Sequence, residues 1–275
     1  MHPILWSFEV AGKTISVHAF GTLIVVGFLA ASFYVQRRAH RDLGLEKDRV
    51  FNVLFWLLIL GILAGRLLYA LLKHDQYRRE PLSFLYVWEG GLVLYGGIIA
   101  SALWLAWYLA RHPEMKGFAF LDIVTLGLAL GLAVGRWASF LSGEAFGVRA
   151  PDLPWAVTFP AGAGGQAPAG VPLQPTQIYL VLLSLLLFLV LWLVQTRRPP
   201  AGRVTGLFLM LYALGRVVIE IFRADWRTSA LQSLGMDTSL ADGLYVFRDL
   251  VSWNQLLSIP VFFAGLAIVL IRRSE

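Results

Sequence analysis

Seven apolar stretches of about 20 residues recur along this sequence, and each is long enough to cross the hydrocarbon core of a bilayer as a helix. Hydrophobic residues make up 58% of the 275 residues and charged residues only 15%, whereas soluble domains contain about 45–50% and about 25%. The sequence therefore predicts an all-α integral membrane protein with seven transmembrane helices in a single membrane domain, 1–275. The predicted spans are 15–35, 50–72, 91–110, 117–141, 176–196, 204–222 and 253–271.

The basic residues predict the orientation of these spans, because short loops rich in Lys and Arg remain in the cytoplasm. Arg37 and Arg38 follow the first span, Arg111 the third, and Arg197 and Arg198 the fifth. We therefore expect the N-terminus outside and the C-terminus in the cytoplasm. These loops account for the net charge of +6, so no nucleic-acid partner is expected. The remaining connections form a small loop-rich head on the outer side, in the segments 73–90, 142–175 and 223–252.

Charged side chains inside the predicted spans are functional candidates, because a charge in hydrocarbon is costly. Arg66, Arg136 and Arg216 fall in the outer halves of the second, fourth and sixth spans. Arginine presents a planar set of donors that fits phosphate, so three arginines at one depth predict a pocket for an anionic phospholipid headgroup. The alternative is a structural network in which backbone carbonyls satisfy the arginines. Asp122 lies deeper, where we expect it to cap a helix or anchor a loop.

The sixth span places several polar residues on one helical face. Tyr212, Arg216, Glu220 and Arg223 are separated by four, four and three residues, the spacing that brings side chains together on a helix. Arg216 and Glu220 can pair, but one glutamate cannot neutralise three arginines. The excess positive charge favours an anionic ligand.

Small residues predict how the spans pack. Gly127, Gly131 and Gly135 recur every four residues in the fourth span, and Gly61 and Gly65 do so in the second. Such faces let helix backbones approach closely in lipid. We expect these glycines to serve packing rather than chemistry.

The chain contains no cysteine, so any thiol in its chemistry must come from a partner. Its five histidines show no metal-ligand spacing, and neither a metal site nor a cofactor is predicted. His18, near the outer end of the first span, is a candidate for catalysis or for a hydrogen bond between helices.

Several short motifs together resemble the prolipoprotein diacylglyceryl transferases, a family of bacterial inner-membrane enzymes. The order and spacing of the motifs carry the resemblance, which covers most of the chain. The motifs are Gly65-Arg66 with Tyr69, the segment 88–91, Tyr95-Gly96-Gly97, Asp122, 135–147, 175–179, 212–223 and 255–260.

The resemblance implies transfer of a diacylglyceryl group from phosphatidylglycerol to the lipobox cysteine thiol in the signal peptide of a preprolipoprotein, with release of glycerol phosphate. The outer segments would then form a periplasmic head. Arg136 and Arg216 are expected to hold the lipid phosphate. The residue that accepts the proton of the thiol is not identified; the candidates are Tyr95, His18, Glu144 and Glu220. The expected substrate-binding residues are Arg66, Tyr69, Gly96, Gly97, Ser139, Ser142, Gly147, Tyr212 and Arg223.

Six positions depart from the common pattern of the family, namely Phe20, Tyr95, Ser139, Ser142, Gln174 and Leu180, and three of them bear most on function. Phe20 stands where a tyrosine is usual, and the two serines stand where asparagine is common. Serine still donates and accepts hydrogen bonds, whereas phenylalanine does not. These departures motivate a second hypothesis, a membrane protein that binds anionic phospholipid without catalysis or carries a phosphorylated solute.

Overall fold

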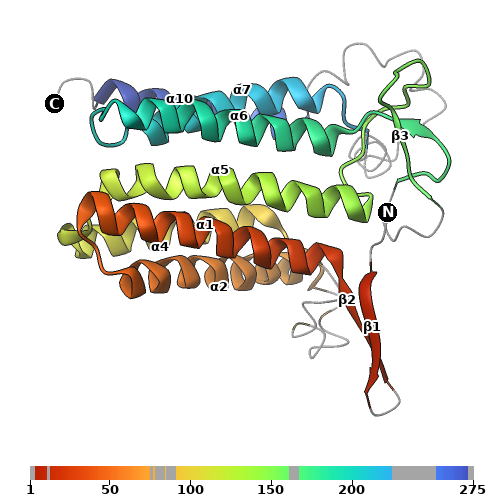
Figure 1. Ribbon diagram of the computed structural model, residues 1–275, viewed down its shortest axis with the longest axis horizontal. Helices are drawn as coiled ribbons and strands as arrows, with labels where there is room; N and C mark the ends of the chain where they lie inside the picture. Colours follow the sequence, from red (N-terminus) through yellow and green to blue (C-terminus); the bar gives the residue numbers. More distant parts are fainter. Residues whose placement is uncertain are drawn as a thin grey trace. The chain divides into compact units, whose positions relative to one another are not determined.

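The computed structural model describes residues 4–10, 13–74, 77, 84, 91–160, 167–224 and 252–271. The chain divides into two compact units, which are described separately: the first contains 1–33 and 121–275, and the second contains 34–120. Long helices make up most of the described residues (Figure 1). They are α1 (Ala19–Leu43), α2 (Lys47–Leu72), α4 (Leu94–Arg111), α5 (Gly117–Ser142), α6 (Thr176–Thr196), α7 (Arg203–Glu220) and α10 (Trp253–Ile271).

Five of these helices are long and apolar enough to cross a membrane, namely α1, α2, α5, α6 and α10. Helices α4 and α7, of 18 residues each, are not among these five, and α7 carries Arg203, Arg216 and Glu220. The helical prediction is thus confirmed, with five apolar candidate spans among the described residues. Helices α6 and α10 coincide with two predicted ranges, whereas α7 ends at Glu220, two residues before the predicted limit.

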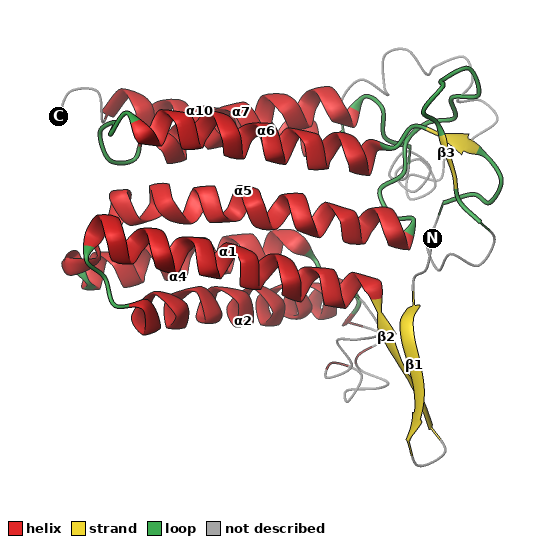
Figure 2. Ribbon diagram, in the orientation of Figure 1, coloured by secondary structure: helices red, strands yellow, loops and turns green. Residues whose placement is uncertain are grey.

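The predicted start of the first span at residue 15 is wrong, because that part of the chain is a strand. Strand β1 (Ile4–Val10) pairs antiparallel with β2 (Lys13–His18), and α1 begins only at Ala19 (Figure 2). Residues 13–18 are rich in β-branched side chains, which suit a strand. A short apolar run does not distinguish a strand from the first turn of a helix.

Short strands also occur between α5 and α6, where a loop-rich head was predicted. Strand β3 (Val157–Thr158) pairs antiparallel with β4 (Pro172–Leu173). In the second unit, a short 3₁₀ helix (Pro113–Met115) follows α4. Helix α4 itself begins at Leu94 rather than at residue 91, because Gly91 has a φ of +79° and so cannot continue a right-handed helix.

Small residues bring the helices of the first unit close together. Helix α7 packs on both α6 and α10 (Figure 1). A Cβ atom added to Gly206 of α7 would lie 2.7 Å from the carbonyl oxygen of Gly265 in α10, and the converse distance is 2.6 Å. Gly131 of α5 faces Gly27 of α1, so the predicted packing role of this glycine is confirmed.

Asp122 fixes the start of α7, as the sequence predicted for a cap or loop anchor. Its carboxylate accepts hydrogen bonds from the backbone N–H groups of Gly202 at 2.7 Å and Thr205 at 2.8 Å. The Thr205 hydroxyl donates a third bond at 2.7 Å. Because a helix leaves its first N–H groups without partners inside the helix, this carboxylate from α5 satisfies them and joins the two helices at one end.

In the second unit, α2 and α4 pack through glycines from both helices. A Cβ on Gly96 would lie 2.7 Å from the carbonyl oxygen of Ala64, and one on Gly97 would lie 2.6 Å from that of Gly61. The Ser101 hydroxyl donates to the carbonyl oxygen of Leu57 at 3.1 Å. The packing role predicted for Gly61 is therefore confirmed.

Candidate active site

A buried carboxylate at the end of α7 organises the candidate site in the first unit. Glu220 is 1% exposed. Its Oε2 atom lies 2.9 Å from Nη2 of Arg216 and 3.2 Å from Nη1 of Arg223. Its Oε1 atom accepts a hydrogen bond of 2.8 Å from the amide of Asn254 in α10. A charge taken out of water needs partners of this kind, and here both oxygens have them.

Arg216 uses only one end of its guanidinium in this ion pair. Its Nη1 atom is buried and has no hydrogen-bond partner, and the side chain as a whole is 11% exposed. A buried donor without a partner is costly. A ligand with acceptor oxygens would relieve that cost, and its negative charge would also offset the positive charge around it.

The excess charge comes from three arginines. The guanidinium groups of Arg223 and of Arg136 in α5 both repel that of Arg216. Arg136, which is half-buried, therefore lies within electrostatic reach of α7. Counted over the described residues of the cluster, three cations and the carboxylate of Glu220 leave two positive charges, so the cluster attracts anions. The Tyr212 ring lies one turn before Arg216 and stacks on Phe208 with 5.5 Å between centroids.

The loop after α5 holds other predicted residues beside this cluster. Glu144, which is exposed, and Gly147 lie on this loop. The buried side chains of Thr176 and Gln177, at the start of α6, donate 2.6 Å hydrogen bonds to the carbonyl oxygens of Ala145 and Glu144. The start of α6 thereby fixes the backbone on which Glu144 sits.

The same loop pairs with the chain that leaves α7. Gly147 and Arg223 form an antiparallel bridge. The N–H of Val148 donates to the carbonyl oxygen of Phe222 at 2.9 Å, and the N–H of Ala224 donates to that of Phe146 at 3.1 Å. This pairing fixes the backbone of Arg223, whose side chain meets Glu220.

The two predicted serines lie at the end of α5. The Ser142 hydroxyl donates to the carbonyl oxygen of Ser139 at 3.2 Å, and both residues are partly exposed. They follow Arg136 by one and two turns. They are thus placed between that arginine and the loop that carries Glu144.

Comparison with known proteins identifies the family. The family model described as prolipoprotein diacylglyceryl transferase matches residues 6–271. The chain belongs to the prolipoprotein diacylglyceryl transferase family. Curated relatives named phosphatidylglycerol–prolipoprotein diacylglyceryl transferase support this. The protein from Geobacter sulfurreducens is 37% identical over 93% of this chain and 91% of its own length. The protein from Chromohalobacter salexigens is 33% identical over 100% of this chain and 95% of its own length. The protein from Pseudomonas aeruginosa is 30% identical over 98% of this chain and 94% of its own length.

Within this transferase, Arg66 lies in the second unit and holds the chain after α2. Its Nε donates to the carbonyl oxygen of Phe84 and its Nη1 to that of Gly91, both at 3.0 Å. The guanidinium also lies 5.8 Å from the ring centroid of Tyr69 and 5.6 Å from that of Tyr77. These contacts match the structural alternative considered for the arginines. The substrate-binding roles of Arg66 and Tyr69 stay predictions.

The glycine motif of the second unit packs against α2. Gly96 and Gly97 face the backbone of that helix. Close helix packing therefore explains a glycine at both positions, in addition to the predicted substrate contact. Tyr95 precedes them in the first turn of α4 and is 39% exposed. Residues 88–90 of the motif lie outside the described residues. His18 ends β2, and its side chain also lies outside the described part.

The sequence did not single out Asn254 or Gln177, which both contribute to the site. An asparagine or glutamine in an apolar helix has no spacing rule that identifies its partner. Only the packing of α10 on α7 brings Asn254 to Glu220, and only the turn before α6 brings Gln177 to the loop after α5.

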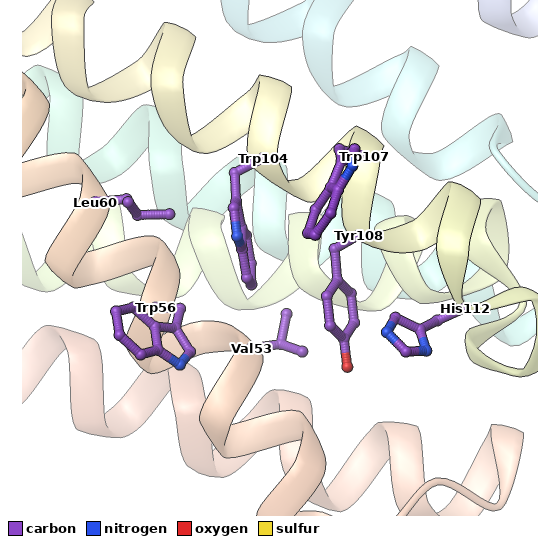
Figure 3. Close-up of a pocket in the computed structure, with 7 residues that line it drawn as sticks. All are labelled: Val53, Trp56, Leu60, Trp104, Trp107, Tyr108 and His112. Atoms are coloured by element: carbon purple, nitrogen blue, oxygen red, sulfur yellow. The ribbon is translucent and has the colours of Figure 1, made fainter.

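A separate cavity of the transferase lies in the second unit between α2 and α4. One wall contains the rings of Trp104 and Tyr108 from α4 and that of His112, which directly follows the helix (Figure 3). Their centroids are 5.2 Å and 4.3 Å apart. The predicted catalytic residues do not line this cavity. Beside it, the pKa of Glu114 is lowered to about 2 by a hydrogen bond from its own backbone and by Arg49.

A methyl group at Gly147 is expected to separate the loop from Arg223. A Cβ there would lie 2.5 Å from the carbonyl oxygen of Gln174 and 2.8 Å from that of Phe222, and backbone atoms cannot move away cheaply. Overpacking of this kind costs about 1–3 kcal/mol. Gly147→Ala should therefore lower both the melting temperature and the turnover of the purified protein.

Gly21→Ala is the matched control, because a Cβ at Gly21 in α1 would meet nothing within 4 Å. It should leave turnover unchanged and should not lower the melting temperature, because alanine is the better helix former. If Gly147→Ala behaves like this control, the close pairing of the loop with the chain after α7 is wrong.

Proposed function

We propose that Arg216 and Arg136 hold the phosphate of phosphatidylglycerol while its diacylglyceryl group passes to the thiol of a lipobox cysteine. As a family member, the chain is an enzyme of the bacterial inner membrane that transfers a diacylglyceryl group from phosphatidylglycerol to a prolipoprotein. The unpartnered Nη1 of Arg216, beside a carboxylate whose oxygens are both occupied, is the observation that carries the proposed role.

The geometry suits a phosphate better than a second carboxylate partner. Arginine and phosphate form charge-assisted hydrogen bonds, often two at a time. Arg216 has one such donor available, and Arg136 approaches from another helix. Two net positive charges also fit the reaction, because the phosphodiester carries one negative charge and the released phosphate monoester carries about two at neutral pH.

The reaction exchanges one bond for another at the glyceryl carbon. The thiol loses its proton, because the thiolate is the nucleophile, and the sulfur then bonds to that carbon. The bond between the carbon and the phosphate oxygen breaks, and its electron pair leaves with glycerol phosphate. Arginines aimed at that oxygen would stabilise the charge as it develops, which accelerates the step.

Of the four candidate proton acceptors, Glu144 fits best among those whose surroundings are described. Glu220 accepts bonds from two arginines and an asparagine, so its lone pairs serve to orient those groups. Glu144 is exposed and lies on the loop that pairs with the chain at Arg223. This exposed position, in contrast to the buried one of Glu220, supports Glu144 as the proton acceptor.

We also propose the orientation in which the site faces outward. The connection between α6 and α7 contains Arg197 and Arg198, and Arg203 begins α7; basic loops remain in the cytoplasm. Glu220 and Arg223 lie at the opposite end of α7. The candidate site is therefore assigned to the periplasmic side, with the N-terminus outside and the C-terminus inside.

An assay with purified components tests the proposed role of the arginines. The protein is mixed with phosphatidylglycerol and a peptide containing a lipobox cysteine, and thioether product and glycerol phosphate are measured. Wild-type protein should form both in equal amounts. Arg216→Ala and Arg136→Ala should each lower turnover about a hundredfold, the usual loss of one preorganised donor, and lysine should restore activity only in part.

Circular dichroism and melting temperature show whether these variants remain folded. If both alanine variants are folded and keep near-normal turnover, the phosphate-holding role is wrong. If wild-type protein binds phosphatidylglycerol without forming product, the non-catalytic lipid-binding hypothesis is favoured instead.

The absence of cysteine in the sequence allows a direct test of the orientation. Single cysteines are introduced at two exposed sites, Asp152→Cys in the loop before β3 and Arg198→Cys after α6. A membrane-impermeant maleimide applied to intact spheroplasts should label only the first, and after lysis it should label both. The reverse pattern would contradict the proposed orientation.

A further inference from the structure

We propose that Asn254 is a positioning residue that keeps Nη1 of Arg216 available for the substrate phosphate. The proposal rests on the proposed function and adds the reason why this arginine pairs with Glu220 through one nitrogen only. Asn254 acts through Oε1 of Glu220, which accepts its amide N–H at 2.8 Å.

Without Asn254, we expect Arg216 to pair with both carboxylate oxygens of Glu220. Arginine and carboxylate commonly pair through two parallel hydrogen bonds, and the end-on form of this pair would use both Nη atoms of Arg216. Glu220 instead meets Arg216 at Oε2 alone, 2.9 Å from Nη2. Its other oxygen is occupied by the amide, so Nη1 stays without a partner in the folded chain.

The first turn of α10 holds Asn254 in place. The Ser252 hydroxyl accepts the N–H of Gln255 at 3.1 Å, and the Gln255 side chain accepts the N–H of Ser252 at 2.7 Å. This reciprocal pair is a capping box. The Gln255 amide also donates to the carbonyl oxygen of Val217 at 3.2 Å, which ties α10 to α7 within one turn of Glu220.

An amide is suited to this position because it donates a hydrogen bond without adding charge. Among the described residues, the charged groups around Glu220 are Arg216 and Arg223, and both Arg136 of α5 and the titratable Tyr212 act on Arg216. A carboxylate in place of the amide would repel Glu220 and reduce the positive charge offered to the phosphate. An apolar side chain would leave Oε1 open to Arg216.

Two substitutions and a control test the proposal in the phosphatidylglycerol and peptide assay. Asn254→Leu should lower kcat and kcat/KM together by about tenfold, because the interaction lost is one made most strongly in the transition state. Asn254→Asp should show a similar loss at neutral pH. Ser258→Ala should match wild type, since this buried hydroxyl bonds only the backbone carbonyl of Asn254, at 2.7 Å.

The pH profile of Asn254→Asp separates positioning from a merely structural role. Two adjacent carboxyl groups share a proton more readily as pH falls, and the introduced carboxyl then donates to Glu220 as the amide did. Activity of this variant relative to wild type should therefore rise on acidification. Activity per folded molecule is used throughout, with the folded fraction taken from size-exclusion profiles and melting curves.

The outcomes distinguish this inference from the proposed function. If Arg216→Ala abolishes turnover while both Asn254 variants keep wild-type kcat per folded molecule, the positioning role is wrong and the phosphate role stands. If Arg216→Ala is itself fully active, both are wrong. A variant of Asn254 with normal kcat but a lower melting temperature would also overturn the positioning role.

Discussion

The buried carboxylate of Glu220 is the interaction on which the candidate site depends. A buried glutamate is stable only with compensating donors, and here they come from two arginines and from α10. Removing any one of them would take a hydrogen-bond donor from the buried carboxylate. The same contacts determine which arginine nitrogen can meet a ligand, so the stability of this end of α7 and its chemistry have the same origin.

The site also requires close approach of the helices and loops around it. Paired glycines let α7 lie against α10 with backbones in near contact, and the loop after α5 pairs with the chain that leaves α7. At the other end, Asp122 joins α5 to the start of α7. Helix α7 is thus fixed at both ends, which limits how far Arg216 can move.

The sequence predicted those features that depend on local pattern. Apolar length predicts α6 and α10, and spacings of four and three residues predict that Arg216, Glu220 and Arg223 share a face. The sequence did not predict features that depend on partners far apart along the chain. Asn254 acquires its role only through helix packing, and the contacts of Arg66 with backbone carbonyls follow from the path of the chain after α2. The hairpin at the N-terminus was missed because its apolar residues fit either periodicity.

The central claim is that Arg216 offers Nη1 to the phosphate of the lipid while Nη2 stays with Glu220. An experimental structure of the protein with bound phosphatidylglycerol measures this directly. We predict a phosphate oxygen about 2.7–2.9 Å from Nη1 of Arg216, the usual length of such a charge-assisted bond, with the contact to Glu220 retained. A lipid phosphate bound elsewhere, with Nη1 paired to a protein oxygen, would contradict it.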